Sequence, residues 1–302
     1  MKPKGFILNS PVMAKTSILF KSLIFITSIM LLSDNSTGQS VAPGHYAAIN
    51  GLHMYYELYG SGKPLVLIHG GGSTINSSFG RILPELAKKY RVIAVELQAH
   101  GRTRDIDRPL SFEQDADDVA ALLGQLDVKS AAIFGFSNGA TTAMQIAIRH
   151  PQMAERLVLA SGLYKRSGTD PRFWDGFQHA TLNDMPQSLK EAYLKVNPDP
   201  KGLQVMFDRD VKRMSDFKDM KDEDIRSVTI PALVLSSDRD VMTPEHSVEI
   251  YRLLSQGRLV ILPGSHGEYM GVAESGAADM ALPALTIKVV ETFLDAPANS
   301  EK

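Results

Sequence analysis

The sequence predicts an α/β fold built on one mostly parallel, doubly wound sheet. Two patterns predict it: short continuous apolar runs recur along the chain, and stretches with helical spacing of apolar residues separate them. The composition agrees with a globular protein, since 44% of the 302 residues are hydrophobic and 22% are charged. A chain of this length forms one large domain or two small ones.

The first predicted element is a β-hairpin. Residues 46–59 read as two short strands around Asn50-Gly51, a dipeptide that favours a tight turn between antiparallel strands. Apolar runs at 64–70 and 91–97 then predict two buried strands. We expect a helix near 78–89 between them.

The next helix is predicted over residues 111–126. Ser111 precedes it as an N-cap, and Glu113 and Asp115 place negative charge in its first turn, where the helix dipole favours it. The apolar residues that recur at helical spacing are Phe112, Ala116, Val119, Ala120 and Leu123.

The same alternation continues to the end of the chain. Buried strands are predicted at 131–136, 156–161, 231–237 and 258–264. Helices are predicted at 139–150, 244–256 and 283–295.

Residues 164–228 interrupt this alternation. The segment contains Pro171, Pro186, Pro198 and Pro200, mixes both charge signs and has no clear buried strand. Its large apolar residues are Phe173, Trp174, Phe177, Met185, Tyr193, Met206, Phe207, Met214 and Phe217. Because open α/β sheets bind ligands at the carboxyl ends of their strands, we interpret the segment as a helical lid over that edge. A peripheral helical appendage is the alternative.

The first 38 residues resemble a secretory signal. An apolar run at 22–32 follows Lys15 and Lys21, and small polar residues then precede a suitable cleavage point after Gly38. We expect a periplasmic or secreted protein, with an uncleaved membrane anchor as the alternative. Either Met1 or Met13 can be the translation start. The expected organisation is a signal at 1–38, a core at 39–163 and 229–302, and the lid at 164–228.

The composition excludes several kinds of function. A formal net charge of −2 lacks the positive charge of an electrostatic nucleic-acid binder, so we expect no nucleic-acid partner. The absence of Cys excludes disulfides, thiolate catalysis and zinc–thiolate sites. The sequence also lacks a recognisable metal site or dinucleotide-binding motif, and we expect no cofactor.

A candidate nucleophile lies where the strand at 131–136 meets the following helix. The sequence Gly135-Phe136-Ser137-Asn138-Gly139 has the G-x-S-x-G pattern of a sharp strand-to-helix turn that exposes the serine hydroxyl. The flanking glycines avoid collisions across that turn, and the helix N-terminus favours nearby negative charge. Ser137 is therefore the predicted nucleophile, rather than an ordinary turn serine.

A candidate oxyanion hole follows the strand at 64–70. Glycines in His69-Gly70-Gly71-Gly72 allow backbone N–H groups to turn toward a developing negative charge. We predict that the N–H groups of Gly71 and Asn138 form the hole, with Gly72 as the alternative to Gly71. His69 is expected to orient this loop by hydrogen bonds.

The acid and the base are expected after the last two strands. Two carboxylates compete to orient the catalytic histidine, and Asp240, four residues before Pro244, is favoured over Asp238. Asp238 is then expected to bond the backbone of the turn or to position the loop. His266 in Gly264-Ser265-His266-Gly267 is the predicted base. His100, on a loop, is its main rival.

These four motifs, in this order, resemble those of the α/β-hydrolase fold family over roughly residues 45–296. The stretch ELQAHGRT at 96–103 is also similar to the family, with Glu96 at the usual acidic position and Ala99 where Gly is common. The resemblance implies a triad of Ser137, Asp240 and His266 and a cap between the sixth and seventh strands.

The expected reaction is cleavage of a carboxylic ester or lactone, a small-molecule substrate, through an acyl-enzyme. A serine nucleophile argues against dehalogenase and epoxide hydrolase activity, which use Asp in this fold. The alternatives are a carbon–carbon bond hydrolase or aminopeptidase of the same fold, or a non-catalytic sensor. The sequence does not indicate an oligomeric state.

Overall fold

The computed structural model describes residues 44–276 and 279–297. These described residues belong to one compact unit. The expected signal segment at 1–38 lies outside the described residues. Within the described part, none of the helices combines the length and apolar character that crossing a membrane requires.

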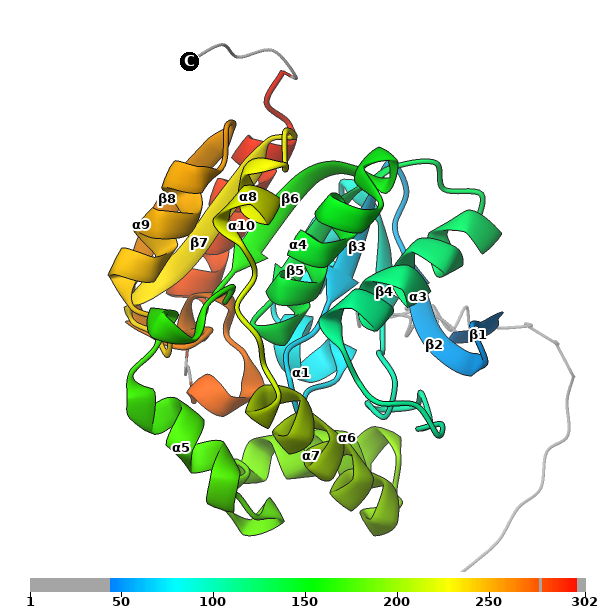
Figure 1. Ribbon diagram of the computed structural model, residues 1–302. Coiled ribbons are helices and arrows are strands. Elements are labelled where there is room, and N and C mark those ends of the chain that lie inside the picture. Colours follow the sequence, from blue (N-terminus) through cyan, green and yellow to red (C-terminus); the bar gives the residue numbers. More distant parts are fainter. Residues whose placement is uncertain (1–43, 277–278, 298–302) are drawn as a thin grey trace, which may run out of the picture. The chain divides into compact units, whose positions relative to one another are not determined.

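The unit is built on one eight-stranded sheet with the order β1-β2-β4-β3-β5-β6-β7-β8 (Figure 1). The strands are β1 (His45–Ile49), β2 (Leu52–Tyr59), β3 (Lys63–Ile68), β4 (Tyr90–Val95), β5 (Ala131–Phe136), β6 (Ala154–Ala160), β7 (Ala232–Arg239) and β8 (Gly257–Ser265). The β1–β2 and β2–β4 pairs are antiparallel, and every other pair is parallel. The predicted mostly parallel sheet with an N-terminal hairpin is confirmed.

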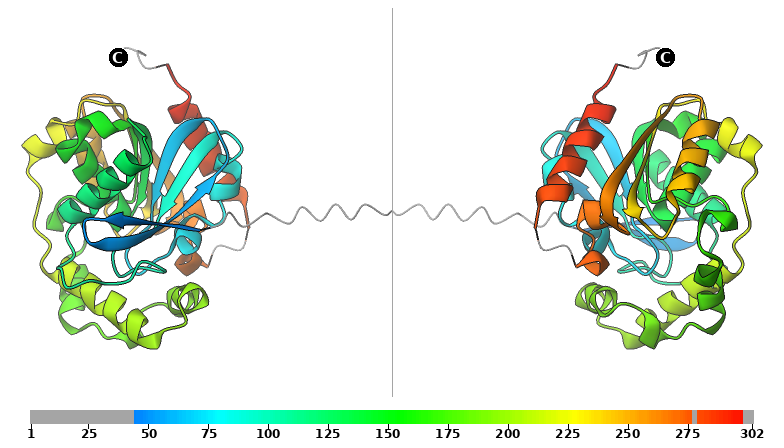
Figure 2. Two further views of the ribbon diagram at one scale, coloured as in Figure 1. Left: turned by 90° about the vertical axis from the view of Figure 1, so that its right-hand side faces the viewer. Right: turned by 90° about the vertical axis from the view of Figure 1, so that its left-hand side faces the viewer.

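Helices cover both faces of the sheet, as Figure 2 shows from two sides. On one face lie α3 (Phe112–Gln125), α4 (Asn138–Arg149) and α9 (Pro244–Leu253), and on the other α1 (Ile75–Phe79), α2 (Leu83–Leu86) and α10 (Ala281–Leu294). Successive strand residues point to opposite faces, so Val66 and Ile68 join one buried cluster while Leu65 and Leu67 join the other. This is why the strands read as continuous apolar runs.

Two local predictions are confirmed, the hairpin turn at Asn50-Gly51 and the N-cap at Ser111. Asn50 and Gly51 both have positive φ, 47° and 87°, as the tight hairpin turn requires. The Ser111 side chain accepts a hydrogen bond from the backbone N–H of Gln114 and caps α3.

The single helix predicted near 78–89 is wrong. Two short helices, α1 and α2, occupy this stretch, and α1 ends at Phe79. Pro84 lies at the start of α2, because its missing N–H is tolerated in a first turn but not inside a continuing helix.

Between β6 and β7 the chain forms four helices and no named strand, all within the described residues. They are α5 (Pro171–His179), α6 (Gln187–Val196), α7 (Pro200–Ser215) and α8 (Asp222–Arg226). Figure 1 shows α5, α6 and α7 grouped at one end of the sheet. The α6–α7 pair has a small apolar core of its own: Met185, Leu189, Tyr193, Leu203 and Met206.

Short 3-10 turns complete the described chain. They are η1 (Pro151–Met153), η2 (Arg166–Gly168), η3 (Leu182–Asp184), η4 (Glu268–Met270) and η5 (Ala273–Ser275).

Candidate active site

Ser137 lies on a strained turn between β5 and α4. Its φ of 54° is positive, a conformation that non-glycine residues rarely adopt. Gly135 and Gly139 allow the turn, because a Cβ on Gly135 would collide with the backbone of Gly139. The backbone N–H of Ser137 is held by the carbonyl of Ala160 at 2.8 Å. The turn therefore holds Ser137 at the N-terminus of α4.

His266 follows β8 directly and reaches the serine. Its Nε2 lies 3.1 Å from the Ser137 Oγ, and its ring packs against Phe136 with 4.9 Å between ring centroids. Its Nδ1 lies 2.5 Å from the Asp240 Oδ1. Burial lowers the pKa of His266, but the Asp240 carboxylate outweighs burial, so the pKa is raised above its ordinary value. The structure thus brings together all three side chains expected of the triad.

Asp240 is buried and has more partners than the sequence indicated. Its Oδ2 accepts hydrogen bonds from the Ser161 hydroxyl at 2.5 Å and the Ser237 backbone N–H at 3.2 Å. The Tyr269 hydroxyl lies 2.7 Å from the Ser161 Oγ. Burial raises the pKa of Asp240, but hydrogen bonds from His266, Ser161 and Ser237 more than offset that effect and keep the pKa below its ordinary value.

Ser161 and Tyr269 are site residues that sequence reasoning missed. Ser161 follows β6 at the edge of the sheet where the other site residues lie, and its φ of 51° turns it out of the strand. The only sequence feature that could have indicated Ser161 is its position at the end of a predicted strand. Tyr269 lies in η4 and is buried, and no local pattern distinguishes it from a core tyrosine.

The glycine-rich loop lies beside the nucleophile. Gly70, Gly71 and Gly72 line the same cavity as Ser137 and Asn138. The Gly72 N–H is already bound to the Asp210 Oδ2 at 2.6 Å, whereas no hydrogen bond within the described residues uses the N–H of Gly71 or Asn138. Between the two alternatives for the first oxyanion donor, this arrangement favours Gly71.

Comparison with known proteins identifies the fold. A family model described as alpha/beta hydrolase fold matches residues 63–209. This chain has the α/β-hydrolase fold.

Two relatives and one solved structure illustrate the similarity. Serine hydrolase BPHL of Homo sapiens is 26% identical over 247 residues, covering 75% of this chain and 81% of the relative. A pimeloyl-[acyl-carrier protein] methyl ester esterase of Neisseria meningitidis is 28% identical over 266 residues, covering 78% and 79%. The enol-lactonase of Burkholderia xenovorans superposes with a TM-score of 0.64 at 21% identity, covering 83% of this chain and all of that one (100%).

The other histidines considered for the hydrolase have structural partners. His69 Nδ1 lies 2.7 Å from the Gly70 carbonyl, and its Nε2 accepts from the Leu97 N–H at 3.1 Å, as expected for a loop-orienting residue. Burial and the neighbouring His100 lower the pKa of His69 to about 3. His100 is fully buried and paired with Asp210, not with Ser137.

Asp238 has the role expected of the second carboxylate. Its Oδ1 accepts a hydrogen bond from the Gly264 N–H at 2.8 Å and so ties the loop after β7 to the end of β8. Its side chain is exposed, and the carboxylate that bonds to His266 is that of Asp240. The two carboxylates at the end of β7 thus have different roles: Asp238 holds the loop, and Asp240 bonds to His266.

The cavity above Ser137 has a volume of about 340 Å³. The helices between β6 and β7 supply much of its wall, through apolar side chains that include Phe173, Phe177, Met185, Leu189 and Phe207. Its charged or titratable lining consists of Asp184, Asp210, Glu274 and His266, with no Lys or Arg among the described lining residues.

Glu274, which lines the cavity, is a third site residue that the sequence did not reveal. Its Oε2 is buried and has no hydrogen-bond partner among the described residues. Burial raises the pKa of Glu274, while its carboxylate in turn contributes to raising the pKa of His266. Glu274 is therefore coupled electrostatically to His266.

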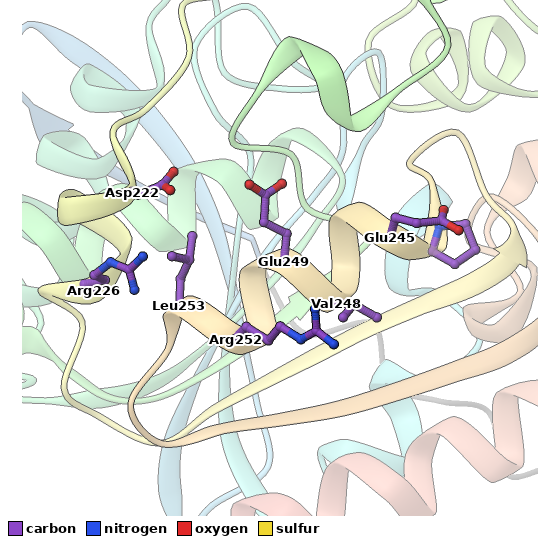
Figure 3. A pocket seen from close by; sticks show the side chains of 8 residues that line it. Asp222, Arg226, Glu245, Val248, Glu249, Arg252 and Leu253 are labelled. Carbon is purple, nitrogen blue, oxygen red and sulfur yellow. The ribbon is translucent and has the colours of Figure 1, made fainter.

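A second hollow lies away from these residues, between α8 and α9 (Figure 3). It is larger, about 550 Å³, and its wall mixes Asp222, Glu245 and Glu249 with Arg226 and Arg252. Its described lining residues include no serine or threonine nucleophile and no histidine base. Chemistry, not volume, identifies the cavity over Ser137 as the candidate active site.

Proposed function

We propose that the protein is a serine hydrolase that cleaves a carboxylic ester or lactone through an acyl-enzyme. One observation carries the proposal: the Ser137 hydroxyl lies at hydrogen-bond distance from His266, whose other ring nitrogen bonds to buried Asp240. A nucleophile, a base and an orienting carboxylate in this chain of contacts are the parts that acyl transfer needs.

The proposed reaction has two halves. His266 Nε2 takes the Ser137 proton as the oxygen attacks the acyl carbonyl, and the resulting imidazolium is stabilised by Asp240. His266 then gives that proton to the leaving alkoxide, which departs and leaves an ester on Ser137. In the second half His266 activates a water, which releases the acid and restores the serine.

The oxyanion formed in each half would be stabilised by the N–H groups of Gly71 and Asn138. Both N–H groups lack partners within the described residues, and the second lies at the N-terminus of α4, where the helix dipole favours negative charge. Each such donor contributes roughly 2.7–4 kcal/mol to lowering the barrier in hydrolases of this kind.

The substrate we propose is small, neutral and partly apolar. A cavity of about 340 Å³ with a largely apolar wall suits a modest acyl or alcohol group. Its carboxylate-bearing and cation-free lining disfavours an anionic group on the substrate. The names of the relatives support ester chemistry, since they include a methyl ester esterase and an enol-lactonase. We further propose that the helical insertion acts as the lid.

The test combines labelling with turnover. The purified protein would be treated with a fluorophosphonate probe, with mass spectrometry to locate the adduct, and assayed for hydrolysis of p-nitrophenyl acetate and butyrate. We expect labelling at Ser137 and turnover of both esters, and neither in Ser137→Ala. Labelling without turnover of esters or lactones would favour a carbon–carbon bond hydrolase, an aminopeptidase or a sensor. Absence of labelling in a folded sample would overturn the mechanism.

We also propose that residues 1–38 are a signal peptide and that the mature protein is periplasmic or secreted. The proposal rests on the apolar run at 22–32 and the small residues that follow it. N-terminal sequencing of exported material should begin near Gln39. Recovery of the full-length chain in membranes would favour the anchor instead.

A further inference from the structure

Asp210 reaches from the helical insertion into the glycine-rich loop. It lies on α7, and its Oδ2 accepts hydrogen bonds from the Gly72 N–H at 2.6 Å and from His100 Nε2 at 2.9 Å. Its Oδ1 accepts from the Arg213 guanidinium. One carboxylate thus joins α7 to two loops of the core that are distant in the sequence.

The contacts of His100 require an imidazolium. Its Nδ1 lies 2.8 Å from the Gln98 carbonyl oxygen, and its Nε2 lies 2.9 Å from the Asp210 Oδ2. Both partners are acceptors, so both ring nitrogens must carry a proton. Burial lowers the pKa of His100, but Asp210 more than offsets this and raises it above its ordinary value. The His69 ring, 4.8 Å away between centroids, is neutral, because its Nε2 accepts a hydrogen bond.

The charges around Asp210 balance. Buried Arg213 pairs with Asp210 and also with Asp115, whose Oδ2 lies 2.8 Å from Nη1 of Arg213. His100 and Arg213 supply two positive charges against the two carboxylates, although burial raises the pKa of Asp115 to about 6. An unbalanced carboxylate at the cavity wall would repel an oxyanion, whereas a carboxylate held between two cations does so much less.

The glycine-rich loop needs such a contact. Glycines let N–H groups approach a substrate closely but leave the backbone free to change conformation, and Gly72 has a φ of 62°. The Gly70 N–H is bound to the Ser78 hydroxyl at 3.2 Å and the Gly72 N–H to Asp210. The Gly71 N–H between them has no partner in the part of the chain that the structure describes, and the bonds on either side fix its orientation. This is the preorganisation that an oxyanion hole requires.

We propose that Asp210 is a positioning residue for the oxyanion hole, which it orients by binding the Gly72 N–H while His100 and Arg213 neutralise its charge. This inference rests on the proposed function. It also makes the docking of α7 part of the catalytic geometry, because the carboxylate reaches the loop only from that helix.

The test compares Asp210→Asn with Asp208→Asn on p-nitrophenyl acetate, whose acyl group is too small to depend on much of the cavity wall. Asp208 is a matched control, since it lies on the same helix but is exposed, and its carboxylate accepts a hydrogen bond from the Gln204 side chain. In Asp210→Asn we expect kcat to fall roughly tenfold to a hundredfold, because a Gly71 N–H that is held loosely stabilises the oxyanion much less. KM should change by less than about threefold, and Asp208→Asn should leave both constants within about twofold.

A second measurement does not depend on turnover. In wild-type protein labelled with ¹⁵N-histidine, both ring nitrogens of His100 should have imidazolium chemical shifts at pH 7, and Asp210→Asn should convert them to those of a neutral ring. Failure of wild-type protein to hydrolyse esters would count against the proposed function alone, because this signal is read without a substrate.

Three results would overturn the proposal. The first is a folded Asp210→Asn variant with unchanged kcat, and the second is a rise in KM alone, which would indicate simple packing of α7. The third is a neutral His100 in the wild type. If Asp210→Asn does not fold, His100→Gln decides, since it retains an N–H toward Asp210 and removes the positive charge: a severalfold loss of kcat supports the proposal, and an unchanged kcat overturns it.

Discussion

The protein contains two histidine–aspartate pairs near one cavity, and they differ in what the second ring nitrogen meets. In the His266–Asp240 pair that nitrogen faces the Ser137 hydroxyl, which has a proton to give. In the His100–Asp210 pair it faces the Gln98 carbonyl, which can only accept one. The first histidine can act as a base, whereas the second is held as a cation.

The difference shows that a carboxylate partner does not make a histidine catalytic. Both pairs raise the pKa of the histidine, so the pKa shift alone would not separate them. The partner of the other nitrogen decides the role: a hydroxyl gives proton transfer, and a carbonyl gives a fixed charge. His100, the rival base in the sequence, therefore cannot act as a base, because both of its ring nitrogens donate to acceptors.

The largest expected effect comes from removing the Ser137 hydroxyl or the His266 imidazole of the first pair. Ser137→Ala, His266→Ala and the double variant should each lower kcat by roughly a million-fold, because nucleophile and base act as one unit. Initial rates with p-nitrophenyl butyrate would measure the loss. Additive losses in the double variant would show that the two side chains act independently and would break the comparison.

The next effect separates the two carboxylates after β7. Asp240→Asn should reduce kcat by about 10⁴-fold, since an amide favours the wrong histidine tautomer. Asp238→Asn should cost less than about tenfold, because Asp238 bonds to the Gly264 N–H and not to the histidine. Steady-state kinetics on both variants would check this ranking, and the reverse order would transfer the orienting role to Asp238.

A smaller effect is expected at Ser161, whose hydroxyl donates to Asp240, whereas the second pair's carboxylate accepts from the Gly72 N–H and Arg213. Ser161→Ala removes one of the hydrogen bonds that keep Asp240 ionised and in place, and we expect a loss of about tenfold in kcat. Ser236→Ala is the matched control, because Ser236 is also buried but bonds to Ser247. Equal losses in the two variants would point to packing rather than to support of Asp240.

The smallest effect is a shift in pH dependence. Activity rises with pH as His266 loses its proton, and the Glu274 carboxylate contributes to raising the pKa of His266. Glu274→Gln should therefore lower that pKa and move the acidic limb of kcat/KM toward lower pH. Glu191→Gln, on the exposed face of α6, should leave the limb in place. A limb that stays fixed or moves upward in Glu274→Gln would remove Glu274 from the electrostatics of His266.

Local sequence patterns determined the alternation of strands and helices and the positions of the motifs at strand ends. Apolar runs predicted the buried strands, Asn50-Gly51 the hairpin, and G-x-S-x-G the turn at Ser137, because each depends on neighbouring residues. The break between α1 and α2 was also predictable locally, because Pro84 lies inside the stretch expected to be one helix.

The tertiary structure alone decided which distant groups meet. Ser161 and Asp240 are 79 residues apart, Gly72 and Asp210 are 138 apart, and neither pair has a spacing that a sequence pattern encodes. Whether His100 is a base or a fixed cation depends on an aspartate 110 residues away. The roles of buried polar groups are set by the partners that folding brings within hydrogen-bond distance, so sequence can nominate these residues but only the packed fold assigns them.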